Sequence, residues 1–200
     1  MNGRQKIALC MPPIIVLSMV GVFQAALLVL KDRQTAWYVG FLFYWPVWGV
    51  LYPLFLIGKE NVFSLFRNRL PKGWEWILFS LPPTTVLLGT MVIRYDPSDL
   101  STKIILVITS FLTGTLEEIL WRGLFVSLFP RQLVKGYIWP ALWFALWHFA
   151  PGTVSNVPVF SLMAGALVLG LCWGLLAYRT ETIRWTALSH ILTGVFRSII

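Results

Sequence analysis

The sequence predicts an all-α membrane protein, a bundle of about seven transmembrane segments in a single domain. Three observations support this fold class. Hydrophobic residues make up 58% of the 200 residues and charged residues only 12%, against roughly 25% charged residues in a soluble globular protein. The apolar residues form runs near the length of about 20 residues that a spanning helix requires. Lys and Arg lie mainly between these runs, where positive charge orients spans.

Seven apolar segments account for most of the chain. They lie at residues 7–30, 36–58, 74–93, 104–128, 137–150, 157–178 and 183–200. The first follows a positively charged start, as in a secretory signal, but its apolar part exceeds the roughly 7–15 residues of a signal core, so we expect a span. The fifth is too short for a full crossing at about 1.5 Å per residue, so we expect a short or partly re-entrant helix.

Two features between and within these segments have structural interpretations. The connection from the second to the third segment, NVFSLFRNRLPKG, is either a short helix on an anionic membrane surface or a basic loop with some buried apolar side chains. In the sixth segment Ala166, Gly170 and Gly174 recur at four-residue spacing, which allows another helix to pack closely. We expect a helix contact there and no functional site.

The Lys and Arg residues of the connections orient the segments. With a cytoplasmic N-terminus, the inner side holds Arg4, Lys6, Lys59, Arg67, Arg69, Lys72, Arg131, Lys135, Arg179 and Arg184, and the outer side Lys31, Arg33, Arg94, Lys103 and Arg197. This bias predicts an integral, multi-pass membrane protein whose N-terminus is cytoplasmic. The formal charge of +8 does not indicate nucleic-acid binding, because the basic residues form no single patch.

Two acids and two histidines interrupt the apolar segments. Glu117 and Glu118 lie at membrane depth, whereas the other acidic residues fall in loops or at segment ends. His148 and His190 lie in the fifth and seventh segments. Because an ionisable side chain at the centre of a membrane helix costs at least about 2.5 kcal/mol on insertion scales, these four residues are candidates for function.

Helix geometry separates the roles of the two acids. Glu118 and Arg122 are four residues apart, so they stack on one helix face, with the acid N-terminal to the base as the favourable order requires. We expect them to form a buried structural ion pair. Glu117 is rotated by about 100° from Glu118 and faces a different neighbour. It is therefore the acid that is available for chemistry.

The expected topology brings Glu117, His148 and His190 to similar depths. Their distances from the inner ends of their helices are about 18, 17 and 10 Å at 1.5 Å per residue. We therefore predict one polar chamber in the cytoplasmic half of the membrane, opening toward the cytoplasm. There a carboxylate and an imidazole could deprotonate a water molecule for attack on a carbonyl, while the second histidine donates to the developing oxyanion.

These residues also match the motifs of a known family. Residues 117–122, EEILWR, fit the motif EExxxR, residues 144–148, FALWH, fit FxxxH, and His190 takes the place of a third-motif histidine. In these motifs the chain resembles the CPBP family, which includes type II CAAX prenyl proteases and bacteriocin-processing or abortive-infection membrane proteins. The resemblance covers residues 104–200 as a catalytic core and leaves residues 1–100 as variable N-terminal spans of one domain, 1–200.

The resemblance implies an intramembrane endopeptidase that hydrolyses a peptide bond with activated water. Its implied catalytic residues are Glu117 and His148 as the base pair and His190 as the oxyanion donor, and its supporting residues are Glu118, Arg122 and Phe144. We favour a mechanism without a cofactor; the alternative is a zinc or other divalent ion held by Glu117, His148 and His190. The implied substrate is a membrane-associated peptide, such as a prenylated tail, a peptide precursor or a protein with a C-terminal membrane tag.

One position departs from the family pattern. The third motif is commonly HxxxN, but Gly194 stands four residues after His190. Losing one oxyanion donor typically lowers a rate by about 10²–10³, unless Thr193, Ser189 or a water molecule replaces it. The alternative function is therefore a catalytically inactive immunity or regulatory membrane protein that binds a partner. A proton-coupled transporter is a third alternative, although the sequence shows no duplicated halves.

Overall fold

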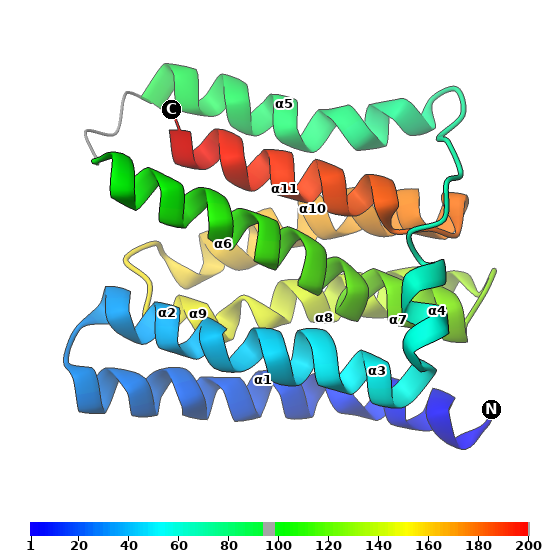
Figure 1. Ribbon diagram of the computed structural model, residues 1–200, viewed down its shortest axis with the longest axis horizontal. Helices are drawn as coiled ribbons and strands as arrows, with labels where there is room; N and C mark the ends of the chain where they lie inside the picture. Colours follow the sequence, from blue (N-terminus) through cyan, green and yellow to red (C-terminus); the bar gives the residue numbers. More distant parts are fainter. Residues whose placement is uncertain (94–98, 200) are drawn as a thin grey trace.

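The computed structural model describes residues 1–93 and 99–199, and its long helices run along a common direction (Figure 1). The elements are α1 (Gly3–Leu30), α2 (Arg33–Tyr44), η1 (Trp45–Leu51), α3 (Tyr52–Ile57), α4 (Lys59–Ser64), α5 (Glu75–Ile93), α6 (Leu100–Glu118), η2 (Ile119–Gly123), α7 (Leu124–Leu128), η3 (Val134–Ile138), α8 (Trp139–Trp147), α9 (Phe149–Gly152), α10 (Val159–Thr180) and α11 (Arg184–Ile199). The elements η1, η2 and η3 are π-helical. Arg94, one of the basic residues assigned above to the outer side, lies outside the described residues.

The all-α prediction is confirmed, but the predicted count of about seven spans is not. Within the described residues, four helical runs are long and apolar enough to cross a membrane: Gly3–Leu30, Arg33–Ile57, Leu100–Leu128 and Val159–Thr180. The segments predicted at 74–93, 137–150 and 183–200 correspond to α5, to η3 through α9, and to α11. The last has 16 residues and rises about 24 Å, less than the roughly 30 Å of a bilayer core.

Side-chain caps mark where three of the helices begin. Asn2, Asp32 and Asp99 each accept a hydrogen bond from a backbone N–H of the first turn of α1, α2 and α6, which satisfies a donor that has no partner inside the helix. Asp99 accepts from Ser101 Oγ at 2.6 Å and from the Thr102 nitrogen at 2.7 Å, and these bonds hold the pKa of Asp99 below its usual value. This cap fixes the start of the helical run that carries the acid pair.

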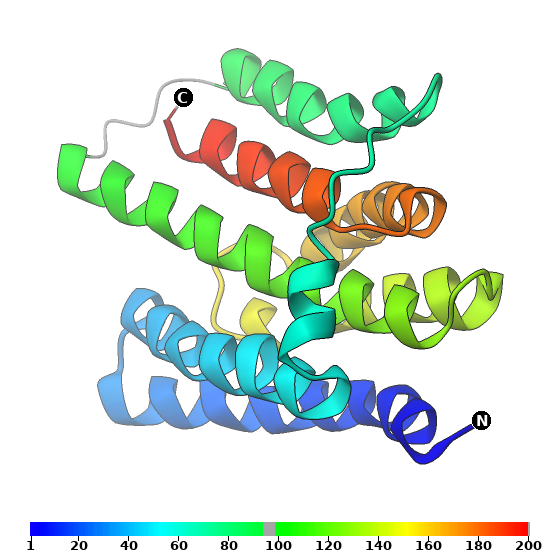
Figure 2. The ribbon, with the colours of Figure 1, turned by 45° about the vertical axis from the view of Figure 1, so that its right-hand side comes forward.

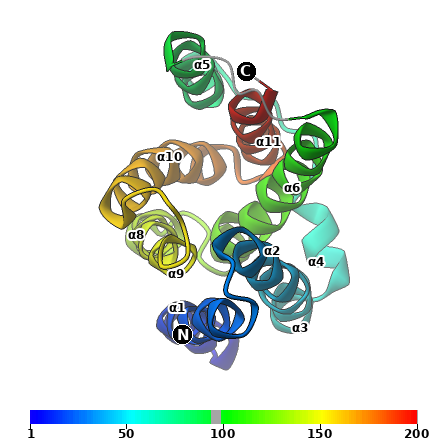
Figure 3. The same ribbon diagram turned by 90° about the vertical axis from the view of Figure 1, so that its left-hand side faces the viewer.

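Seen end-on, α6, α11, α10 and α8 surround the middle of the bundle (Figure 3). Helices α1 and α2 pack together on one side, and α5 packs against α11 and α10 on the other. Helices α6 and α11 approach closely, since a Cβ added at Gly114 would lie 2.8 Å from the Ile191 nitrogen. Helices α10 and α8 do likewise, since a Cβ at Gly170 would lie 2.9 Å from the Phe144 ring. The close contact predicted from the small residues of the sixth segment is therefore present.

One end of the bundle is closed by the connection between α4 and α5. We call residues 65–73 the linker, and the end that they cross, on the right in Figure 1, the linker end; Figure 2 shows the crossing. The Leu65 carbonyl accepts hydrogen bonds from the Ile183 nitrogen at 2.9 Å and from Thr182 Oγ1 at 2.6 Å. The connection contains a short helix, α4, and the loop after it buries Leu65. The position of this helix on a membrane surface stays a prediction.

Candidate active site

Glu117 lies in the last turn of α6 and is 1% exposed. Its Oε1 accepts a hydrogen bond from Trp147 Nε1 at 2.9 Å. Its Oε2 lies 3.9 Å from His190 Nε2 and has no hydrogen-bond donor within the described part of the chain. One oxygen of the carboxylate is therefore held in place, and the other faces a histidine.

Glu118 is buried beside it and contacts two basic side chains. Its Oε1 lies 3.1 Å from Arg122 Nη1 and 3.0 Å from His190 Nδ1. The predicted ion pair is thus present, although Arg122 lies in the π-helical turn η2, an element often found at functional sites. The contact with His190 was not predicted. Because an ionised carboxylate can only accept, His190 Nδ1 carries a hydrogen.

Aromatic rings and a carbonyl surround the Arg122 guanidinium. Its carbon Cζ lies 4.0 Å from the centre of the Phe144 ring and 5.6 Å from that of Trp173. Its Nη2 donates to the Gly170 carbonyl at 3.4 Å. Cation–π contacts of this kind are strongest when the cation is desolvated. Phe144 therefore supports the buried cation directly.

A series of contacts fixes the ring of His190. The ring stacks on Trp173 with centroids 4.0 Å apart, and Trp173 Nε1 donates to Ser189 Oγ at 3.0 Å. The Ser189 hydroxyl donates in turn to the Phe79 carbonyl at 2.7 Å, and the Thr193 hydroxyl donates to the Ser189 carbonyl at 2.8 Å. Neither hydroxyl considered above as a replacement oxyanion donor is therefore free to donate into the site.

His148 lies at the junction of α8 and α9. Its Nδ1 is 2.8 Å from the Phe144 carbonyl oxygen, and its ring lies edge-on to the Phe144 ring at 4.8 Å. Since a carbonyl can only accept, Nδ1 carries the hydrogen, and Nε2 of the neutral ring is an acceptor. No hydrogen bond or ion pair joins His148 to Glu117 among the described residues. His148 instead adjoins the cluster through Phe144, whose ring centroid lies 6.1 Å from that of His190.

The space beside Gly194 is filled by a serine of α6. A Cβ added at Gly194 would lie 2.7 Å from Ser110 Oγ and 2.8 Å from Ser110 Cβ. An asparagine at position 194 would therefore require the Ser110 side chain or one of the two helices to move. The glycine has a packing explanation, which is the close crossing of α6 and α11.

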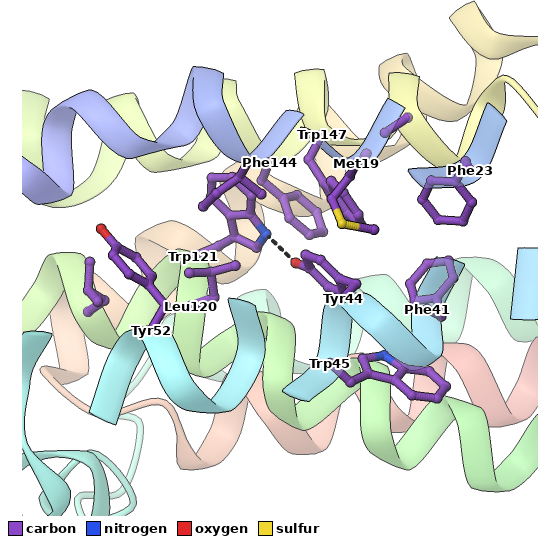
Figure 4. Packing of buried hydrophobic residues seen from close by; sticks show 14 of the residues in the cluster. Met19, Phe23, Phe41, Tyr44, Trp45, Tyr52, Leu120, Trp121, Phe144 and Trp147 are labelled. Carbon is purple, nitrogen blue, oxygen red and sulfur yellow. Dashed lines mark hydrogen bonds between the residues drawn. The ribbon is translucent and has the colours of Figure 1, made fainter. Parts of the chain in front are cut away.

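Sequence reasoning missed Trp147 and the aromatic residues behind it. Trp147 stacks on Tyr44 with centroids 4.0 Å apart and an interplanar angle of 13°. The Tyr44 hydroxyl accepts a hydrogen bond from Trp121 Nε1 at 2.9 Å (Figure 4). Trp147 could have been found, because it directly precedes His148 in the second motif. Tyr44 lies on α2, far from the motifs, and gave no local signal.

The acids and histidines, as arranged, do not form a metal site. Among the described residues no group of three or more His, Cys, Asp or Glu side chains could hold a metal ion. The Nδ1 atoms of His190 and His148 are engaged by Glu118 and Phe144. The zinc alternative, in which Glu117 joins the two histidines as ligands, therefore requires these side chains to regroup.

Comparison with known proteins gives one match, to the second half of the chain. Residues 99–196 match the family model described as type II CAAX prenyl endopeptidase Rce1-like. The matched range begins at the cap of α6 and includes every predicted site residue. No curated protein and no solved structure matches the chain. The family match confirms the resemblance found in the motifs.

Proposed function

We propose that the protein hydrolyses a peptide bond within the membrane, because its residues 99–196 match the family model of Rce1-like type II CAAX prenyl endopeptidases. One observation carries the mechanism. The buried Glu117 carboxylate has one oxygen bound by Trp147 and the other turned toward His190. A general base needs such a fixed orientation beside the position where the proton is removed.

A water molecule beside Glu117 Oε2 would be the nucleophile. The 3.9 Å between Oε2 and His190 Nε2 is too long for a direct hydrogen bond. A water bound to Oε2 would satisfy this otherwise unpaired buried oxygen. His148, whose Nε2 is an acceptor, is the second base in this proposal. Its approach to the water is expected on substrate binding, because catalytic hydrogen bonds often tighten only in the complex.

The reaction balances with Glu117, His190 and the water molecule. Glu117 takes a proton from the water, and the resulting hydroxide attacks the carbonyl carbon of the scissile amide. The carbonyl oxygen becomes negative and accepts a hydrogen bond from an N–H at His190 Nε2. The proton on Glu117 then passes to the leaving nitrogen as the C–N bond breaks.

The charges of the cluster favour a protonated His190 for this step. The carboxylates of Glu117 and Glu118 and the guanidinium of Arg122 together carry one net negative charge. His190 contacts both carboxylates, so its protonation makes the cluster neutral. Burial is far less costly for a neutral, hydrogen-bonded group of charges than for one with an unpaired charge.

The position of Glu117 supports the proposed substrate class. It is buried within the candidate span Leu100–Leu128, which favours a membrane-associated peptide: a prenylated tail, a peptide precursor or a protein with a C-terminal membrane tag. The positive charge of the linker end favours a cytoplasmic N-terminus and a site in the cytoplasmic half of the bilayer.

A catalytically inactive binding protein is the second candidate function. It is favoured by the absence of a side chain at Gly194 and by the hydroxyls of Ser189 and Thr193, which donate to backbone carbonyls. Such a protein would keep the buried cluster for stability and bind its partner elsewhere.

Cleavage by the purified protein in lipid nanodiscs tests the first function. Prenylated and unprenylated versions of one peptide serve as substrates, and products are identified by mass spectrometry. We expect Glu117→Gln to lower the rate by about 10²–10⁴, the usual contribution of a general base, because the amide can still accept from Trp147 but cannot take a proton. Glu60→Gln, which neutralises an exposed acid of α4, is the matched control and should retain full activity.

Two further measurements separate the alternatives. Loss of cleavage in a zinc chelator, restored by zinc, would replace the cofactor-free mechanism with the metal alternative. Equal cleavage by wild type and Glu117→Gln would reject the proposed role of Glu117. If neither the wild type nor Glu117→Gln cleaves any peptide, and the folded Glu117→Gln protein is as effective as wild type in a cellular immunity assay, the binding function is correct.

A further inference from the structure

Three arginines converge on a single glutamate at the linker end, outside the proposed active site. Arg67 Nη2, Arg69 Nη1 and Arg131 Nε lie 3.2, 3.5 and 3.5 Å from the Glu181 carboxylate. The arginines come from two connections, the linker and the turn after α7, and the glutamate from the turn after α10. We call these four residues the arginine cluster. They bring three chain segments together at one point of the surface.

The arginine cluster carries more positive charge than folding explains. Three guanidinium groups and one carboxylate leave two positive charges, and no other carboxylate lies within ion-pair distance of the three arginines in the described part of the chain. The nearest acid of α5, Glu75, is paired with Arg179 at 3.3 Å. Exposed ion pairs stabilise a fold very little, and the side chain of Arg131 is 88% exposed. The cluster therefore has unused capacity for an anion.

Backbone contacts hold two of the arginines in place before any ligand arrives. The Arg67 carbonyl accepts from Thr182 Oγ1 at 3.1 Å, and the Arg69 carbonyl from Trp185 Nε1 at 2.8 Å. Arg67 Nη2 also donates to the Glu181 carbonyl at 2.8 Å. A site whose donors are already ordered loses less entropy on binding. Guanidinium groups also match phosphate oxygens in geometry better than ammonium groups do.

The surroundings of the cluster are those of a membrane surface. The cluster lies where the candidate span Val159–Thr180 ends. Trp76 and Trp185 pack edge-on at 5.3 Å beside the linker, and tryptophans favour the level of the lipid headgroups. Phe63 and Leu70, on either side of Arg67 and Arg69 in the chain, are largely exposed. Apolar side chains next to arginines are typical of a segment lying on lipid.

We propose that the arginine cluster is a binding site for the phosphate group of an anionic phospholipid. Arg67, Arg69 and Arg131 donate to the phosphate oxygens, and Phe63 and Leu70 contact the acyl region. The two positive charges of the cluster that Glu181 does not neutralise match a headgroup that carries up to two negative charges. This site is separate from Glu117 and does not depend on the protease function.

Native mass spectrometry of the full-length protein, released from detergent with defined lipids, tests the proposal. The probes are phosphatidic acid, phosphatidylglycerol and, as the neutral lipid, phosphatidylcholine. We expect retained anionic lipid to exceed phosphatidylcholine, and Arg131→Gln to weaken anionic binding about fivefold, the effect of one basic residue near a charged membrane surface. Because Arg131 is so exposed, this variant should fold normally. Arg67→Gln combined with Arg131→Gln should reduce retention further.

Two control variants separate a specific site from general surface charge. Arg4→Gln removes an exposed arginine of α1 outside the cluster and should leave lipid retention unchanged. Glu181→Gln removes the acid of the cluster and should increase retention of anionic lipid. Equal losses in Arg4→Gln and Arg131→Gln, no loss in either, or reduced retention in Glu181→Gln would each overturn the proposal. Displacement of the lipid by millimolar inorganic phosphate would assign the site to a soluble phosphate and overturn the lipid assignment.

Discussion

Two groups of paired glutamate and arginine side chains, one in the centre of the bundle and one at the linker end, have opposite properties. In the centre, the Glu118 and Arg122 side chains are 0% and 2% exposed, and each contacts further groups from other helices. At the linker end, Arg131 and Glu181 lie at the surface. Removing one partner of a buried pair leaves an uncompensated charge and costs about 3–5 kcal/mol, whereas exposed pairs contribute about 0–1 kcal/mol. Burial, and not the pairing itself, therefore decides that losing one partner of the first pair is costly and that losing one partner of the second is not.

The largest expected effect is the loss of Arg122. Arg122→Ala leaves Glu118 buried without its cation, and we expect a free energy of unfolding lower by about 3–5 kcal/mol, together with loss of activity. Thermal unfolding in detergent, followed by intrinsic tryptophan fluorescence, measures the change. Arg131→Ala is the control and should change stability by no more than about 1 kcal/mol. If both variants lost the same stability, the contrast between the two regions would be wrong.

The next effect concerns how the buried region orients its base. Trp147→Phe keeps an aromatic ring against Tyr44 but removes the N–H that donates to Glu117. We expect the free energy of unfolding to fall by about 1.5–3 kcal/mol, the usual contribution of a hydrogen bond to a charged group. We also expect the rate of cleavage to fall by up to about 10²-fold, because the carboxylate is then poorly oriented.

The matched control for this prediction is Trp143→Phe, one turn earlier on α8. Trp143 packs against Trp139 and makes no hydrogen bond to the acid pair. Steady-state kinetics should separate the two variants. A fall in kcat for Trp147→Phe alone supports a positioning role. Equal falls in kcat for both variants would show that Trp147 acts only through packing.

The smallest effect tests packing in place of charge. Gly194→Asn inserts a side chain into the volume of Ser110, and overpacking of this kind typically costs about 1–3 kcal/mol. Combined with Ser110→Gly, the same substitution should recover most of that loss, because the clash is removed. Thermal unfolding of the two single variants and the double variant forms a complete cycle. Additive effects would show that the two positions do not share space.

Local geometry predicted the parts of the site that lie within one helix. The four-residue spacing of Glu118 and Arg122 fixed their pairing, and the motif placed Phe144 one turn before His148, where its carbonyl binds the imidazole. The motifs also predicted the match of residues 99–196 to a family model, because they combine residue types that are costly inside a membrane. The all-α class was predicted from the length of the apolar runs.

The small residues of the sixth segment predicted a close helix contact, but the side-chain pairings between helices could not be predicted in this way. The bond from His190 to Glu118 depends on how α11 crosses α6, and this crossing is set by the glycines at positions 114 and 194. Tyr44, at the end of α2, reaches the site by stacking on Trp147 of α8. The predicted number of spans is not confirmed, because the apolar runs alone do not show that α11 is only 16 residues long. The sidedness of the chain and the catalytic roles stay predictions.

The attachment of the linker also sets an order of assembly. The hydrogen bond from Thr182 to the Leu65 carbonyl joins residues 117 positions apart. At about 5–20 residues per second, translation needs on the order of ten seconds to make the intervening chain. In the later part of that interval Glu117 and Glu118 have been made but His190 has not, and Arg67 and Arg69 of the linker have no Glu181 to meet until its end. The contacts that complete the arginine cluster and the buried cluster can therefore form only after the end of α10 and then α11 have been made.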